Sequence, residues 1–434
     1  MPDSGTSSPG RGGRGLDLLN FFLADVQTGF GPFVAVYLTT HKWTEIDIGL
    51  ALSVGTITSV ASQLPGGALV DAVRAKRTVA AGGIVGVIVA ALLIAVWPIE
   101  LSVLAAEVLH ALASSVLTPA IAALSLLLAG RAALGERLGR NAAFAAVGSG
   151  LTAAVMGVTG STLGTRTVFW LTAALGLPAL AALAAIRPAA AHPDALPAHE
   201  GLDWRSLREL AGDRRLLVFA AASVLFFVSN AAMLPLAAAQ VTKRTGDLAS
   251  LIIAACIVVP QVVVAAASPW VGRQAARRGR RPLLLAGWGA LGVRGLMLAF
   301  LPGPWLLVAG QSVSGISAAV AGVMLPLIAA DITRERGHFN LCIGIFGLCA
   351  AAGATISTTL AGWIADTSGS RAAFLALAAV GFAGTALLWA AMPETREAPP
   401  EGGGGVRPGN AERPDRKIKT PPTARSPAPE TPGA

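Results

Sequence analysis

Apolar residues form long blocks along the chain, and polar or charged residues collect in the short breaks between them. Each block is about 20 to 25 residues long, enough for a helix to cross a hydrocarbon layer of ~30 Å. The pattern therefore predicts twelve membrane-spanning helices. We expect them at residues 17–40, 46–70, 78–97, 99–129, 142–163, 167–187, 215–241, 248–271, 282–301, 304–330, 340–365 and 371–392.

The composition agrees with this pattern, since 54% of the 434 residues are hydrophobic and only 13% are charged. Soluble chains are about one quarter charged, so we expect an all-α integral membrane protein. The predicted organisation is a disordered tail (1–16), a six-helix bundle (17–187), a linker (188–214), a second six-helix bundle (215–392) and a disordered tail (393–434). The first sixteen residues lack the apolar core of a signal peptide.

The basic residues indicate orientation rather than a nucleic-acid partner. They give a net charge of +9, but they are scattered through short loops instead of following one stripe. Loops on one predicted side hold most of them, whereas the opposite loops hold Lys42, Arg166, Lys243, Arg244 and Arg371. By the positive-inside rule, both termini are expected in the cytoplasm and the chain in the plasma membrane.

Two charged breaks resemble each other, "GGALVDAVRAKR" at 66–77 and "GRQAARRGRR" at 272–281. Other landmarks recur in the same order at similar separations. Gly67 and Gly272 are 205 residues apart, Glu107 and Gln311 are 204 apart, and Asn141 and Asn340 are 199 apart. These repeats predict two pseudo-symmetric halves, an arrangement typical of secondary transporters with a substrate site between the halves.

The breaks carry a motif that resembles one of the major facilitator superfamily, Gly-x-x-x-Asp-(Arg/Lys)-x-Gly-(Arg/Lys)-(Arg/Lys). The first copy matches it at Gly67, Asp71, Lys76 and Arg77, with Ala75 near the glycine position. The second copy has Ala276 in place of the acid and keeps Gly272, Arg277, Gly279, Arg280 and Arg281. The resemblance covers residues 17–392 and implies that Asp71 latches the halves together on the inner side. The alternative is that these residues only set topology.

The chain departs from two other patterns of that family. At the fourth span, "EVLHALASSVLTP" keeps Pro119, but Glu107, His110 and Ala111 replace the arginine, glutamine and glycine of the family. The Gly-Pro motif of antiporters is missing from "VGSGLTAAVMGVTG" in the fifth span. The resemblance therefore leaves the direction of transport open.

Four charged or titratable residues fall inside predicted spans, Asp25, Glu107, His110 and Arg294. An ionised side chain in mid-membrane costs at least ~2.5–3.5 kcal/mol, so each needs a reason. In the resembled family the first, fourth, seventh and tenth spans line a cavity, which makes Asp25, Gln27, Glu107, His110, Asn230 and Gln311 candidates to face it.

Asp25 and Glu107 are the predicted proton carriers, because shielded carboxylates gain and lose protons as water access changes. We expect His110 to tune Glu107, the alternative being a Glu–His hydrogen bond that only packs the bundle. Arg294 is expected to pair locally or to reach the headgroups. Gln63 and Gln261 are expected to support helix packing.

Patterns for other chemistry do not occur. There is no phosphate-binding Gly-x-x-x-x-Gly-Lys loop, no paired cysteines, no His-Glu-x-x-His and no Gly-x-Ser-x-Gly. We therefore expect neither an enzyme nor a bound metal or cofactor.

The predicted function is a monomeric, proton-coupled secondary transporter that exports amphipathic or cationic small molecules. The alternatives are a proton-symport importer and a membrane sensor derived from a transporter.

Overall fold

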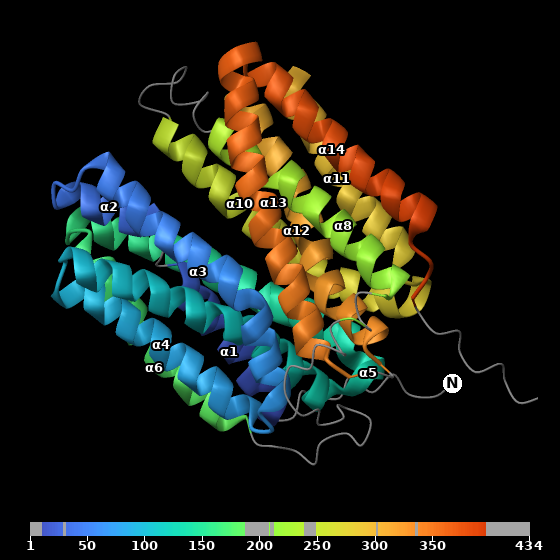
Figure 1. The fold of residues 1–434 in the computed structure, drawn as a ribbon, viewed down its shortest axis with the longest axis horizontal. Coiled ribbons are helices and arrows are strands. Elements are labelled where there is room, and N and C mark those ends of the chain that lie inside the picture. The colour runs from blue at the N-terminus through green and yellow to red at the C-terminus, as the bar shows by residue number, and fades with distance from the viewer. Residues whose placement is uncertain are drawn as a thin grey trace, which may run out of the picture. The chain divides into compact units, whose positions relative to one another are not determined.

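The computed structural model describes residues 11–28, 32–186, 208, 212–237, 249–300, 303–334 and 337–395. The regular structure in these residues is α-helical, as predicted (Figure 1). The helices are α1 (Arg11–Thr28), α2 (Pro32–Thr40), α3 (Glu45–Ala72), α4 (Lys76–Val96), α5 (Glu100–Thr162), α6 (Arg166–Ala185), α8 (Arg214–Asn230), α10 (Ala249–Arg278), α11 (Arg281–Phe300), α12 (Pro304–Ile332), α13 (Phe339–Ser368) and α14 (Ser370–Ala391).

These helices make the twelve predicted crossings of the membrane. Helix α5 holds two of them, because Gly130 interrupts its 63 residues with a φ of 67° that favours glycine. The segments before and after Gly130 are the fourth and fifth spans. Helices α1 and α2, of 18 and 9 residues, together form the first span. The loop expected between the fourth and fifth spans is itself helical.

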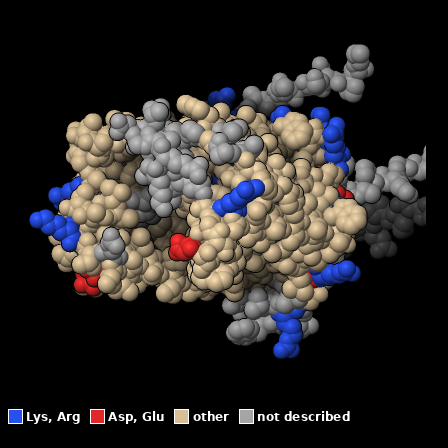
Figure 2. Space-filling view, turned by 90° about the horizontal axis from the view of Figure 1, so that it is seen from above, with Lys and Arg blue, Asp and Glu red and all other residues tan. Residues whose placement is uncertain are grey.

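The outer surface is that of a protein surrounded by lipid. Trp97, Trp305, Trp363 and Trp389 lie near helix ends and are all more than half exposed. Large exposed apolar side chains are unfavourable in water, whereas tryptophan is enriched where a span meets the membrane surface. Figure 2 shows one face of the molecule, on which uncharged residues predominate and basic and acidic side chains are scattered.

The helices are arranged as two halves, an N half of α1 to α6 and a C half of α8 to α14 (Figure 1). In the N half, α1, α3 and α4 pack on α5, and in the C half α11 packs on α12 and α14. The halves meet mainly along α3 with α13 and along α5 with α10. This is the predicted pair of six-helix bundles.

Glycines let the two halves approach closely at two related places. A Cβ at Gly67 of α3 would overlap with the carbonyl of Asn340 in α13, and a Cβ at Gly272 of α10 would overlap with the carbonyl of Gly135 in α5. We call this end of the bundle, where α3, α10 and α12 end and α4, α11 and α13 begin, the basic end.

The same contacts correct the register of the repeat. Gly67 and Gly272 differ by 205 residues, and so do their contacts Asn340 and Gly135. The next pair keeps this separation, because Gly344 packs on Gln63 and Gly139 packs on Ser268. The pairing of Asn141 with Asn340 was therefore wrong by six residues. It relied on matching residue types, whereas backbone contacts define the symmetry.

The predicted tails begin and end differently in the structure. Helix α1 starts at Arg11, inside the tail expected at 1–16, because Gly15 packs against Ile186 and Leu16 is fully buried. At the other end, Glu394 and Thr395 lie in the tail expected from 393 but contact the bundle. Residues 1–10, most of the linker (188–214) and residues 396–434 lie outside the described part of the chain.

Candidate functional site

The two halves line an open cavity of about 740 Å³ between them. Helices α1, α3 and α5 line it from the N half, and α10, α12 and α13 line it from the C half. None of the described residues that line the cavity is charged. Its polar groups come from Asn20, Ser59, Gln63, Thr118, Asn141, Ser149 and Gln261. A mostly apolar pocket with a few amides and hydroxyls suits a small molecule with a few hydrogen-bonding groups.

Sequence reasoning did not identify the amides of this cavity. Gln63 and Gln261 were assigned to helix packing, and Asn20 was not singled out at all. Gln63 does pack, since its side chain lies against Gly347 of α13, yet it also lines the cavity. The available signal was an amide side chain within an apolar span. This signal does not tell which face of the span meets the other half.

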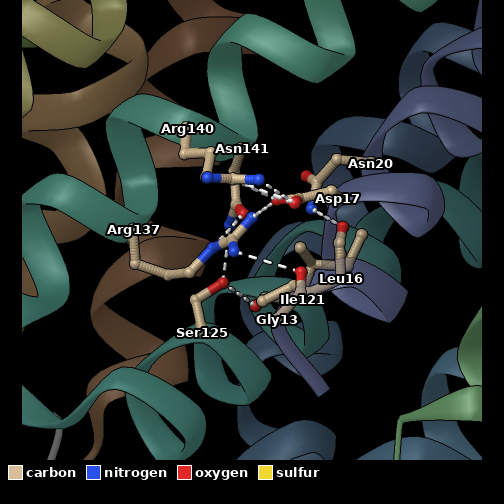
Figure 3. Close-up of polar contacts among 9 residues, drawn as sticks. All are labelled: Gly13, Leu16, Asp17, Asn20, Ile121, Ser125, Arg137, Arg140 and Asn141. Atoms are coloured by element: carbon tan, nitrogen blue, oxygen red, sulfur yellow. Dashed lines mark hydrogen bonds and ion pairs between the residues drawn. The ribbon is translucent and has the colours of Figure 1, made fainter. Parts of the chain in front are cut away.

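A cluster of charged residues adjoins the cavity lining: Figure 3 shows Asp17, Arg137 and Arg140 together with Asn20 and Asn141, two residues that line the cavity. Asp17 of α1 is 3% exposed and forms ion pairs with Arg137 and Arg140 of α5, at 2.7 Å for the Arg140 pair. Arg137 also donates to the side chain of Asn141 at 2.7 Å, and Asn141 donates to Ser125 at 2.7 Å. The cluster thus joins α1 to α5 and reaches the cavity through Asn141.

Glu107 is buried in α5 and is not among the described residues that line this cavity. It is 6% exposed, its Oε2 lies against Gly55 of α3, and its Oε1 has no hydrogen-bond partner in the described part of the chain. His110, one turn further on, lies 3.4 Å from Ser114 through its Nε2. No described hydrogen bond joins His110 to Glu107. Among the described contacts, Glu107 lies against Gly55 of α3 and His110 lies beside Ser114 of its own helix.

Asp25 and Gln27 lie in helix α1, but their side chains are outside the described part of the structure. Their expected places at the cavity stay predictions.

Three further candidates form one cluster in the C half. Arg294 of α11 is 2% exposed and donates to the side-chain oxygens of Asn230 at 2.7 Å and Gln311 at 3.1 Å. The sequence named no partner for Arg294, and it assigned Asn230 and Gln311 to the cavity. In the structure neither is among the described residues that line the central cavity, and Gln311 is only 1% exposed. The amides hold the arginine instead.

The first copy of the charged motif joins the two halves. The carboxylate of Asp71, at the end of α3, accepts hydrogen bonds from the backbone N–H groups of Asn340 and Leu341 at 3.1 and 2.8 Å, and from the Asn340 amide at 2.7 Å. These donors are at the start of α13, where helix N–H groups lack partners within the helix and attract negative charge. Nearby, Arg131 donates to the carbonyl of Ala330 at 2.7 Å.

In the second copy, Arg280 and Arg281 make their described contacts inside the C half. Arg280 pairs with Asp331 of α12 at 3.0 Å, and the backbone N–H groups of Arg280 and Arg281 donate to Glu394 at 2.8 and 3.1 Å. Gly279 adopts a φ of +94°, which requires glycine at this turn. Arg277 is exposed on the last turn of α10. The sequence located both copies but did not distinguish their partners.

A helical membrane protein built from two repeated halves around a cavity has the architecture of a secondary transporter. The chain matches the family model of the Major Facilitator Superfamily over residues 16–259 and 229–426. The chain belongs to this superfamily, and it is a multi-pass membrane transporter rather than an enzyme.

Two proteins are similar to this chain in sequence, one over most of its length and one over about a third. An uncharacterized MFS-type transporter of Mycobacterium tuberculosis is 36% identical over 394 residues, which cover 89% of this chain and 94% of the relative. The class G tetracycline resistance protein of Vibrio anguillarum is 35% identical over 147 residues, only 34% of this chain and 35% of that protein.

Solved structures show the same fold at low sequence identity. The fucose:proton symporter of Escherichia coli has a TM-score of 0.70 and 15% identity, covering 86% of this chain and 97% of that one. The same symporter in the outward conformation also has a TM-score of 0.70. The human organic anion transporter MFSD10 has a TM-score of 0.67 and 15% identity, covering 88% of this chain and 100% of that one.

Proposed function

We propose that this protein is a proton-coupled secondary transporter that moves small amphipathic molecules by alternating access. The central observation is the cavity of about 740 Å³ that both halves line without any charged residue among the described ones. In transporters built from repeats, a site between the halves becomes accessible from one side at a time as they rock. A cavity made of both halves is therefore suited to hold the transported molecule.

In this proposal the basic end faces the cytoplasm, because short loops rich in Lys and Arg stay on that side. Asp71 then acts as a latch that keeps the cytoplasmic side closed by holding the start of α13. Its three hydrogen bonds, between 2.7 and 3.1 Å, support this role. Both termini would be cytoplasmic, and the transporter would work as a monomer in the plasma membrane.

Glu107 is the proposed proton carrier among the described residues. An ionised carboxylate in mid-membrane is costly, and the Oε1 of Glu107 has no described hydrogen-bond partner to offset that cost. Protonation removes the charge, so the stable protonation state depends on whether water reaches the side chain. The packing of Glu107 against Gly55 links this state to the position of α3. Asp25 and His110 remain proposed partners in the same step.

Export is the proposed direction. The uncharged, mostly apolar cavity suits amphipathic compounds, and a stretch of 147 residues is similar to a tetracycline resistance protein. Uptake by proton symport is the second candidate, because the fold is shared with a fucose:proton symporter. A sensor without flux is the third, and any solute-dependent transport would exclude it.

The test is proton movement in proteoliposomes, followed with a pH-sensitive dye while a panel of amphipathic and sugar-like solutes is added. We expect solute-dependent proton flux in the wild type, and its direction separates export from uptake. Glu107→Gln should lose this flux but keep solute counterflow without a proton gradient, because counterflow needs only the cavity and the rocking of the halves.

The matched control is Glu100→Gln, which removes an exposed glutamate at the start of the same helix and should leave proton flux unchanged. Asp25→Asn should behave like Glu107→Gln. Proton-coupled flux that persists in both Glu107→Gln and Asp25→Asn would contradict the assignment of the carriers. Absence of counterflow with every solute in the wild type would contradict the transport proposal itself.

A further inference from the structure

A second cavity, of about 640 Å³, lies at the basic end of the N half. It is bounded by the start of α4, the end of the first segment of α5 and the end of α6. Its walls are apolar, and five leucines contribute to them, Leu124, Leu127, Leu128, Leu180 and Leu183. Because it lies at the ends of membrane spans, this cavity is at the level where lipid headgroups meet the protein.

The rim of this cavity is cationic. Arg74, Lys76 and Arg77 line it, and no acidic residue is among its described lining. Arg77 donates to the carbonyl of Ala184 at 3.1 Å, while its Nε is buried without a hydrogen-bond partner in the described part of the chain. Lys76 donates to the carbonyls of Val70 and Asp71. Carbonyl groups are neutral acceptors, so these hydrogen bonds do not neutralise the positive charge of the rim.

The C half shows what the chain does at the related place when it supplies its own anions. There Arg280 pairs with Asp331, and Glu394 accepts from two backbone N–H groups. At the repeat separation of 205 residues, Asp331 corresponds to Leu126 and Glu394 corresponds to Ala189. The N half thus keeps the cations of the motif but has apolar residues where the C half has acids.

We propose that this cavity binds an anionic phospholipid, with the headgroup phosphate on Arg74, Lys76 and Arg77 and an acyl chain along the leucines. Charge complementarity supports a phosphate, and the apolar wall favours a lipid over a free anion. Basic residues at the cytoplasmic surface attract the anionic lipids of that leaflet. Since Lys76 also donates to the carbonyl of Asp71 at 3.1 Å, the bound lipid would touch the hinge that holds α13.

The test uses the purified full-length protein in nonionic detergent, titrated with dioleoyl phosphatidylglycerol or dioleoyl phosphatidylcholine and followed by native mass spectrometry. We expect one phosphatidylglycerol per chain to bind in preference to phosphatidylcholine. Thr78→Glu places an acid on the rim at an exposed position and should weaken phosphatidylglycerol binding about five- to tenfold. Glutamate is favourable in the first turn of a helix, so α4 should stay folded.

Two single-charge changes serve as a matched pair. Arg74→Gln removes an exposed rim cation and should also weaken binding, whereas Arg278→Gln removes an exposed cation from the hinge of the C half and should not. Thermal unfolding of each variant in detergent confirms that it is folded.

Equal binding of phosphatidylglycerol and phosphatidylcholine, or equal affinity in the wild type and Thr78→Glu, would overturn the proposal. It would also be overturned if the full-length protein did not bind phosphatidylglycerol but a variant without residues 190–205 did. That result would assign the cavity to the acidic linker of the chain itself.

Discussion

The two halves of this transporter share one fold, but they hold their helices together differently at the basic end. In the N half, Asp17 of α1 forms buried ion pairs with Arg137 and Arg140 of α5. At the same positions of the repeat, the C half has Ala222, Cys342 and Ile345. Ala222 and Cys342 are fully buried, so α8 and α13 meet through apolar packing.

The charged hinges differ in the same way. Asp71 of the first hinge reaches across to α13 of the other half, while the second hinge has Ala276 in that place and pairs internally through Arg280 and Asp331. The glycine contacts are symmetric, whereas the charges are not. The comparison indicates that close backbone contacts maintain the common fold and that the charges give each half its own role.

The largest effect is expected from Asp17→Asn, which removes the ionic contact that only the N half has at this position. It leaves Arg137, with a side chain only 9% exposed, without its buried counter-charge. Losing one partner of a buried pair should lower the free energy of unfolding by about 3–5 kcal/mol. Thermal unfolding in detergent measures the change.

The control is Asp366→Asn in the C half, where the aspartate is exposed. A substitution at such a site should change stability by less than about 0.5 kcal/mol. Equal effects of the two substitutions would mean that the N half does not depend on its ion pairs.

A smaller and symmetric effect is expected at the glycine contacts. Gly67→Ala and Gly272→Ala each place a methyl group against a backbone carbonyl of the opposite half. Overpacking of this kind should lower the free energy of unfolding by about 1–3 kcal/mol at each site, and thermal unfolding again measures it. Gly82→Ala is the control, since a Cβ there meets nothing within 4 Å. A loss of stability at only one of the two contacts would show that the repeat symmetry does not extend to the basic end.

The smallest effect is expected from Asp71→Asn, which changes the latch rather than the stability of either half. The loss of a charge-assisted contact at a helix start should shift the balance of the two open states by about 1–2 kcal/mol, roughly tenfold. In a variant without the three native cysteines, Ser149→Cys in the cavity should then react about tenfold faster with a maleimide added from the basic end.

The reverse change in the second hinge sharpens the contrast. Ala276→Asp should not make a second latch, because Gly135 and Glu136 of α5 already lie within a helical segment that starts after Gly130. Their N–H groups are therefore bonded inside the helix. Ala276→Asp can be compared directly with the native latch through the labelling rate of Ser149→Cys. If Ala276→Asp slowed this labelling as strongly as the native Asp71 does, an unpaired N–H donor would have to exist near Gly135 and Glu136.

Much of the architecture was predictable because it depends on local patterns. Span length and apolar content give the twelve crossings, and charge at the span ends gives the expected orientation. The repeat was visible at Gly67 and Gly272, since a tight contact between helices tolerates only the smallest residue. The register failed at Asn141 because identical residue types recur in apolar helices without any structural relation.

The candidate site was less predictable because it depends on how helix faces meet. Glu107 and Arg294 stood out as buried charges, but their neighbours Gly55, Asn230 and Gln311 come from other helices. Asp17 is the first residue of the first predicted span, and only the approach of α5 makes it a buried partner of Arg137.

The sequence by itself determined that this chain crosses the membrane in two repeated sets of helices, because the cost of exposing backbone and charge to lipid leaves few alternatives. The tertiary structure alone decided which amides line the central cavity, which cations line the second cavity of the N half, and which acid joins the halves. These outcomes depend on the rotation of each helix about its axis. That rotation is set by contacts between residues far apart in the chain.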